Sequence, residues 1–274
     1  MQEEKVVEFI SAAHKGIEGW FFPLDQIAFF ELFILLKHLG IDGDVCEVGV
    51  YRGKSLTLLS VLKNAGERLY GFDLFDDDDE NVTRENLREF GSDDDVTLIK
   101  GLTSELSRQK LENLVPSPLR FLHIDAGHEY FEVLEQLKLF TPLMRHQGII
   151  SMDDYQDREF PGIEAAVLDF SEQDRPRRFV PFLAGGNKLF LCSPIFAPTF
   201  QNFLLQRPNF KDKCRLSRVR DFNILILQSK LPVPSAAIAK QLQADFPHWP
   251  DDMQGLNQKS AQYSQLRFGS GLGV

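Results

Sequence analysis

The chain has 274 residues, of which 43% are hydrophobic and 26% are charged, a composition typical of a globular protein with one or two α/β domains. Its formal net charge of -10 argues against nucleic acid or an anionic membrane as a partner, because both are themselves negatively charged. Three cysteines without a C-x-x-C spacing indicate free thiols in a reducing compartment, and the acidic N-terminus does not resemble a signal peptide, so we expect a soluble, cytoplasmic protein. The apolar stretch 24–39 is interrupted by charged residues and is too short to span a membrane, which predicts a buried helix.

In chain order, residues 1–43 are expected to form an N-terminal helical cap. Between residues 44 and 192, short apolar runs alternate with helical patterns. This alternation predicts a Rossmann-like, doubly wound, mostly parallel seven-stranded sheet with helices on both faces. The predicted strands are 45–48, 69–72, 96–99, 120–124, 148–152, 179–182 and 188–192, and the helices between them are 55–64, 83–90, 104–114, 130–144 and 162–170.

The last two predicted strands are joined by a segment that contains Gly185 and Gly186. This segment predicts a hairpin, and therefore an antiparallel edge to the sheet. Residues 193–274 form a C-terminal extension with repeated prolines, in which 222–227 is typical of a strand and 235–246 of a helix. The extension is compatible with a cap over a binding site or with a homodimer contact.

The turn after the first strand, E-V-G-V-Y-R-G-K-S, has the features of a cofactor cradle. Gly49 and Gly53 would let the backbone approach a ligand, and the helix that starts near Ser55 offers unpaired N–H groups. Glu47 would repel a dinucleotide pyrophosphate but suits the cationic amino acid end of S-adenosylmethionine. Asp73 ends the second strand, where an acidic residue typically accepts hydrogen bonds from ribose hydroxyls. These residues together predict S-adenosylmethionine as the cofactor.

An alternative interpretation of this turn is a phosphate-binding P-loop. Residues 49–55 have the pattern G-x-x-x-G-K-S, one residue short of that motif. The missing glycine would have to stand at position 48, which is Val48, and the loop would be too short to wrap a β-phosphate. A nucleotide-dependent enzyme is therefore the weaker hypothesis.

Acidic side chains follow the fourth and fifth predicted strands: Asp125 after one, Asp153 and Asp154 after the other. Parallel strands end at the same edge of a sheet, so the three carboxylates should converge and need a cation to offset their repulsion. Oxygen donors without cysteine predict Mg²⁺ or a similar divalent ion, which would orient a substrate hydroxyl and lower its pKa. His128 would accept the hydroxyl proton, whereas His123, among apolar strand residues, is expected to lie in the core.

The series E-V-G-x-x-x-G-x-S, G-F-D, H-I-D-x-x-H-x-Y, G-I-I-S-M-D-D-Y and F-P-G-I-x-x-A-V resembles the class I methyltransferases, in particular the macrocin-type O-methyltransferase-like family and, more distantly, catechol O-methyltransferase. The resemblance covers about residues 16–192. It implies a metal held by Asp125 and the pair after the fifth strand, and it places Thr103 and Ser104 near the adenine and Asp125 beside the sulfonium. Two departures stand out: His128 replaces the lysine of the catechol enzyme, and Gly127 stands where macrocin-type proteins carry a second aspartate.

The resemblance implies a magnesium-assisted O-methyltransferase that acts on a hydroxyl of a small molecule, either a sugar-containing metabolite or a catechol-like phenol. In this interpretation Asp125 and His128 are the catalytic candidates. A metal-independent methyltransferase and a non-catalytic interaction module on the same fold are the alternatives. The aromatic segment 19–22 is compatible with a lid over the site or with simple packing.

Overall fold

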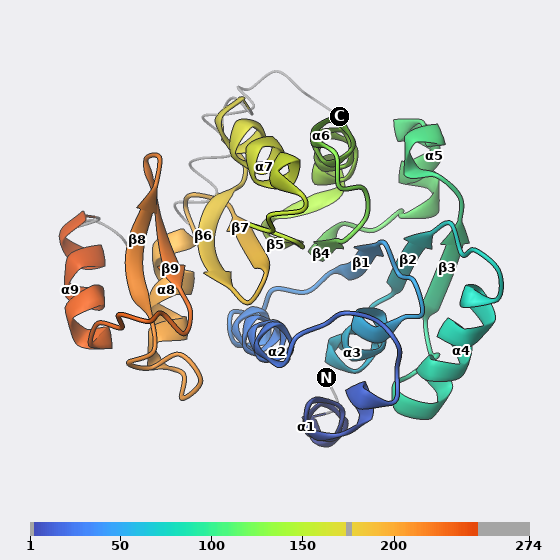
Figure 1. The fold of residues 1–274 in the computed structure, drawn as a ribbon, viewed down its shortest axis with the longest axis horizontal. Helices are drawn as coiled ribbons and strands as arrows, with labels where there is room; N and C mark the ends of the chain where they lie inside the picture. Colours follow the sequence, from blue (N-terminus) through green and yellow to red (C-terminus); the bar gives the residue numbers. More distant parts are fainter. Residues whose placement is uncertain (1–2, 174–176, 246–274) are drawn as a thin grey trace.

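The computed structural model describes residues 3–173 and 177–245 and builds them around a central β-sheet with helices on both faces (Figure 1). Within these residues the sheet has nine strands, in the order β3-β2-β1-β4-β5-β7-β6-β9-β8. Strands β1 to β5 are parallel, β7 is antiparallel to both β5 and β6, and β9 pairs parallel with β6 and antiparallel with β8. The strands are β1 (Asp44–Val48), β2 (Leu69–Asp73), β3 (Val96–Lys100), β4 (Leu119–Ile124), β5 (Met144–Met152), β6 (Val180–Gly185), β7 (Lys188–Cys192), β8 (Arg215–Val219) and β9 (Phe222–Ile226).

The helices form two layers. Helices α1 to α4 cover one face of the sheet and α5 to α7 cover the other, while α8 and α9 accompany the C-terminal strands (Figure 1). The α-helices are α1 (Glu3–Ser11), α2 (Pro23–His38), α3 (Lys54–Leu62), α4 (Asp79–Phe90), α5 (Arg108–Leu114), α6 (Tyr130–Phe140), α7 (Pro161–Gln173), α8 (Ala197–Gln206) and α9 (Ser235–Asp245), and the short 3₁₀ helices are η1 (Ala13–Lys15), η2 (Thr103–Glu105) and η3 (Thr141–Leu143).

Each face of the sheet has its own apolar core. On one face, Phe29 and Phe33 of α2 pack against Phe121 of β4, with ring centroids 5.1 and 4.8 Å apart. On the other, Phe72 of β2 packs edge-on against Phe140 of α6 at 5.3 Å. Helix α2 is apolar around most of its circumference because it contacts the sheet, α1, α3 and α8. The predicted buried helix is thus confirmed, and no helix among the described residues is long and apolar enough to cross a membrane.

The predicted α/β fold and all seven predicted strands are confirmed, but the described sheet contains two strands more. The predicted strand 222–227 is β9. It pairs with β6 on one side and with β8 on the other. The β6–β7 hairpin therefore lies inside the sheet instead of at its edge. Strand β8 was missed because its sequence, R-L-S-R-V, is mostly polar and half exposed, as edge strands often are. The predicted C-terminal helix is α9, and the part of the extension from residue 246 onward lies outside the described residues.

The strand order determines where a binding crevice forms in the sheet. β1 lies between β2 and β4, so the connections after β1 and β4 leave the sheet toward opposite faces. In doubly wound sheets, ligands bind beyond the carboxyl ends of the strands at this point. Gly49 donates its N–H to Phe72 O (2.8 Å), and Asp125 donates its N–H to Val48 O (2.7 Å). These bonds fix the start of both loops at the crevice.

Candidate functional site

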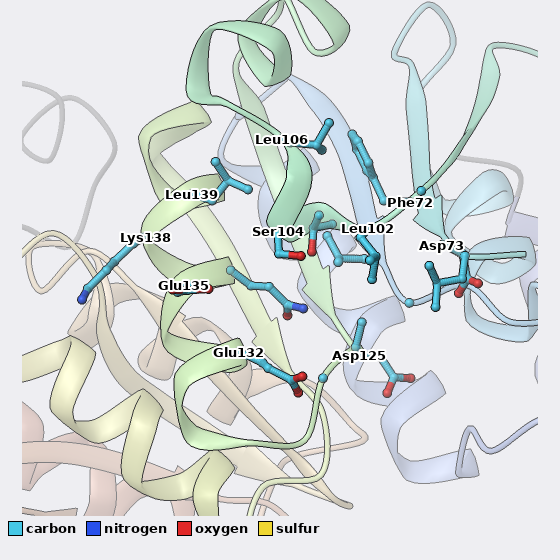
Figure 2. Close-up of a pocket in the computed structure, with 18 residues that line it drawn as sticks. Phe72, Asp73, Leu102, Ser104, Leu106, Asp125, Glu132, Glu135, Lys138 and Leu139 are labelled. Carbon is cyan, nitrogen blue, oxygen red and sulfur yellow. The ribbon is translucent and has the colours of Figure 1, made fainter.

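A cavity of about 680 Å³ lies at the carboxyl ends of β1 to β4 and is closed on one side by helix α6 (Figure 2). Its size falls in the range of small-molecule sites. Among the residues that line it are five predicted to bind cofactor: Gly49, Asp73, Thr103, Ser104 and Asp125. The structure therefore brings most of the predicted cradle together around one cavity.

Gly49 makes the closest backbone approach in the cradle. Its φ is 89°, a conformation that residues with a Cβ rarely adopt, and a Cβ added there would lie 1.9 Å from the carbonyl oxygen of Asp125. Only glycine fits between the loops after β1 and β4. Gly53, which precedes α3, has a φ of 79° and lies against Thr83, but it is outside the lining of the cavity.

Asp73 closes the glycine-containing turn. Its Oδ2 accepts hydrogen bonds from the backbone N–H groups of Val50 (2.6 Å) and Tyr51 (2.9 Å), and its Oδ1 accepts one from Phe75 (2.7 Å). Three of the four lone-pair sites of the carboxylate are thus used, and the one left on Oδ1 can accept from a ligand hydroxyl. The ribose role of Asp73 stays a prediction.

Two further residues predicted to bind cofactor, Glu47 and Ser55, are buried and do not line the cavity. Glu47 is fully buried, and its Oε1 lies 2.6 Å from Nδ1 of His123, with which it forms a hydrogen bond. Ser55 is buried in the first turn of α3. The core position expected for His123 is confirmed, since this side chain has no exposed surface.

A cluster of buried charges continues from His123 to the hairpin strand β7. Nε2 of His123 lies 3.7 Å from Oδ2 of Asp153, and the same oxygen forms an ion pair with the ammonium of Lys188. Burial opposes ionisation of Asp153, but Lys188 and His123 outweigh it and hold the pKa of this carboxyl below its usual value. Burial lowers and the surrounding carboxylates raise the pKa of Lys188, with a net upward shift, so its ammonium stays charged.

Asp25 reaches this cluster from helix α2. It is fully buried and lies against the hairpin turn, where a Cβ added to Gly186 would meet its Oδ1. Burial raises the pKa of Asp25 to about 7, although the charge of Lys188 lowers it. Sequence analysis missed both Asp25 and Lys188. The available signal was a carboxyl group inside a helix predicted to be buried, which must either be protonated or have a buried cation nearby.

Of the three carboxylates predicted to bind metal, Asp125 and Asp153 lie together, whereas Asp154 has other partners. Asp125 faces the cavity, and burial together with the charge of Asp153 raises its pKa. Asp154 instead accepts a hydrogen bond from Asn187 Nδ2 (3.0 Å), and its Oδ2 lies 3.4 Å from Nε2 of His128. The predicted proton acceptor His128 is therefore partnered by Asp154.

The donor groups that lie together already have other partners. Among the described residues, one group of potential ligand atoms lies within 4.8 Å of one another, contributed by His123, Asp125 and Asp153. Both oxygens of Asp153 are already engaged, Oδ1 by the N–H of Asp154 (2.8 Å) and Oδ2 by Lys188. A metal ion at this point would therefore have to share the carboxylate of Asp153 with a positive ammonium.

Residues 46–155 match the model of a family described as a methyltransferase domain. The fold is similar to that of an O-methyltransferase from Bacillus cereus in complex with SAH, with 18% identity and a TM-score of 0.52 over 69% of this chain and 89% of that one. It is also similar to the O-methyltransferase TomG from Streptomyces achromogenes, involved in tomaymycin synthesis and solved in complex with SAM, with 16% identity and a TM-score of 0.51 over 70% of this chain and 89% of that one. An uncharacterised protein of Acanthamoeba polyphaga mimivirus is 25% identical over 139 residues, which cover 50% of this chain and 62% of that protein, so the match spans less than two thirds of that relative.

Proposed function

We propose that this chain, whose residues 46–155 match the model of a methyltransferase domain, transfers a methyl group from S-adenosylmethionine to a hydroxyl of a small molecule. The observation that carries the proposal is the cavity at the β1–β4 switch point, bordered by the glycine turn and by Asp73 and Asp125. The fold, which O-methyltransferases share, supports the same conclusion.

The charge of the cavity suits S-adenosylmethionine, which carries a sulfonium and an ammonium group. Four carboxylates belong to its lining, whereas Lys138 points its ammonium away from the cavity (Figure 2). These carboxylates are Asp73, Asp125, Glu132 and Glu135. Opposite charges attract strongly in a partly desolvated site, and a nucleoside triphosphate would meet repulsion at the same place. The acidic lining thus disfavours the nucleotide-dependent alternative.

The opposite end of the cavity is apolar. Leu106 and Leu139 lie there, away from Asp73 and Asp125 (Figure 2), and Thr103 and Ser104 also belong to the lining. A planar adenine fits between such side chains, with the hydroxyls available for its edge nitrogens. This arrangement supports the predicted adenine position.

In the proposed reaction, the bound cofactor supplies an electrophilic methyl group beside Asp125. His128 lies on the loop after β4, and its Nε2 faces Asp154, so the imidazole is oriented by a carboxylate as a general base would be. Its ring also stacks on Phe160, with centroids 4.1 Å apart. His128 would accept the proton of the acceptor hydroxyl, and the loops would position that oxygen for in-line attack.

Magnesium assistance remains one version of the proposal, supported by the proximity of His123, Asp125 and Asp153. The engagement of Asp153 by Lys188 favours the metal-independent version. The acceptor, a sugar-containing metabolite or a catechol-like phenol, is proposed only as a hydroxylated small molecule. A cytoplasmic location, a homodimer and the absence of nucleic acid and membrane partners stay expectations from composition.

The test is calorimetric titration of the purified chain with S-adenosylhomocysteine, followed by incubation with S-adenosylmethionine and a panel of sugars and phenols, with product mass read by mass spectrometry. We expect micromolar binding and a mass gain of one methyl group on at least one acceptor. His128→Asn serves as the matched variant, which should bind cofactor as the wild type does but turn over more slowly. Absence of cofactor binding would refute the proposal in favour of a non-catalytic module.

A further inference from the structure

Lys188 is the first residue of β7, and its position follows from the sheet. β7 runs antiparallel to β5, with Leu189 opposite Met152, so Lys188 lies beside Asp153, the residue that follows Met152. The lysine is 2% exposed, although a charged side chain at the end of a hairpin could easily turn toward water. A specific set of partners must therefore hold it inside.

The partners come from every element packed around the ammonium. Asp153 forms the ion pair, Asp25 contributes a second buried carboxylate from α2, and the ring of Phe21 lies 5.4 Å from Nζ. His123 and Asp125 complete the surroundings on the side of the cavity. Several carboxylates thus converge on one fixed cation, as they would on a metal ion.

The same contacts leave few ligands for a metal. Asp153 has both oxygens engaged, and Nε2 of His123, the nitrogen that faces the cluster, lies 3.7 Å from the same Oδ2 that pairs with Lys188. An ion at this point would share Oδ2 of Asp153 with an ammonium, and the two cations would repel each other. An ion that used this carboxylate would therefore compete with the ammonium for it.

We propose that Lys188 is the resident cation of this site: its ammonium takes the place of a divalent metal beside Asp153, and the chain works without one. Lys188 acts here as a positioning residue, because it fixes Asp153 below the loop that carries Asp125. The inference about metal binding does not depend on methyl transfer.

The experiment is a titration with Mn²⁺. Binding is monitored by calorimetry and by the electron paramagnetic resonance signal of the free ion. We expect the wild type to bind Mn²⁺ no more tightly than millimolar at this site, and Lys188→Met, which keeps the apolar stem, to bind it at least tenfold more tightly and to gain thermal stability with the ion. Lys63→Met, at a buried lysine at the end of α3, is the matched control and should behave as the wild type does.

Micromolar Mn²⁺ binding to the wild type that is lost in Asp153→Asn would overturn the proposal. A folded Lys188→Met that binds Mn²⁺ no better than the wild type would also overturn it. If Lys188→Met does not fold, the wild-type titration alone decides. Calorimetry with S-adenosylhomocysteine in EDTA is read separately, so a failure of cofactor binding counts against the proposed function and leaves the metal result intact.

Discussion

Replacing Asp73 with alanine removes the acceptor of three backbone N–H groups in the cradle. Hydrogen bonds to a charged group contribute about 1.5–3 kcal/mol each, and the lower figure applies here because the turn borders a cavity open to water. Three such bonds give a loss of about 4.5 kcal/mol in the free energy of unfolding. If Asp73 also accepts from the ribose hydroxyls, the affinity for S-adenosylhomocysteine should fall by about tenfold or more, since 1.4 kcal/mol corresponds to a factor of ten.

The two effects are measured separately. Urea denaturation followed by circular dichroism gives the free energy of unfolding, and calorimetry at a temperature where the variant is folded gives the affinity. Asp76→Ala, which removes the same charge from an exposed position three residues along the chain, is the control and should leave both quantities nearly unchanged. Asp73→Asn sharpens the comparison, because its amide oxygen can still accept from Val50 and Tyr51 while its NH₂ would face the N–H of Phe75. Unchanged stability of Asp73→Ala would refute the turn-closing role, and unchanged affinity would refute the ribose assignment.

Three further predictions concern single side chains. Gly49→Ala should abolish measurable cofactor binding because of the 1.9 Å clash at the cradle, whereas Gly40→Ala, also at positive φ but with no atom within 4 Å, should only lower stability; calorimetry of both tests this. His128→Asn should lower kcat by about 10²–10⁴-fold with little change in cofactor affinity, as measured by initial rates, and equal rates would exclude His128 as the base. Asp25 has a folded pKa raised by burial to about 7 from an ordinary 3.8, so its contribution to stability is full below about pH 4 and is lost as the pH rises through about 7. Relative to Asp25→Asn, the wild type should therefore lose up to roughly 4 kcal/mol of unfolding free energy between these pH values in urea denaturation, and parallel pH profiles of the two proteins would contradict the shift.

The fold could be predicted from the sequence because its parallel strands are nearly all apolar. Runs such as residues 45–48 and 120–124 are buried on both faces, and the helices between them carry the expected periodicity. The position of Gly49 and Asp73 at one cavity could be predicted as well, since both belong to short-range patterns within one β-α-β unit. Strand β8 could not, because its pairing with β9 compensates for a polar sequence that has no strong periodicity of its own.

The charged cluster was the hardest part to predict. Convergence of Asp125 and Asp153 was expected from the strand order, but the identity of their compensating cation depends on which residue of β7 faces β5. That register is a long-range property of the sheet and is absent from any local motif. A lysine at the end of a hairpin is normally solvated, so the sequence offered no reason to place Lys188 inside.

The contact between Asp25 and the β6–β7 hairpin has a consequence for the order in which the protein folds. Helix α2 emerges from the ribosome well before the hairpin, but its buried Asp25 does not meet the charge of Lys188 until β7 has been made. Asp153 likewise lacks its ion-pair partner until Lys188 has been synthesised. Removing one partner of a buried pair typically costs about 3–5 kcal/mol, so a nascent chain that ends before β7 should stay open around this region. Synthesis of a single strand late in the chain would then close the N-terminal helix, the central strands and the hairpin together.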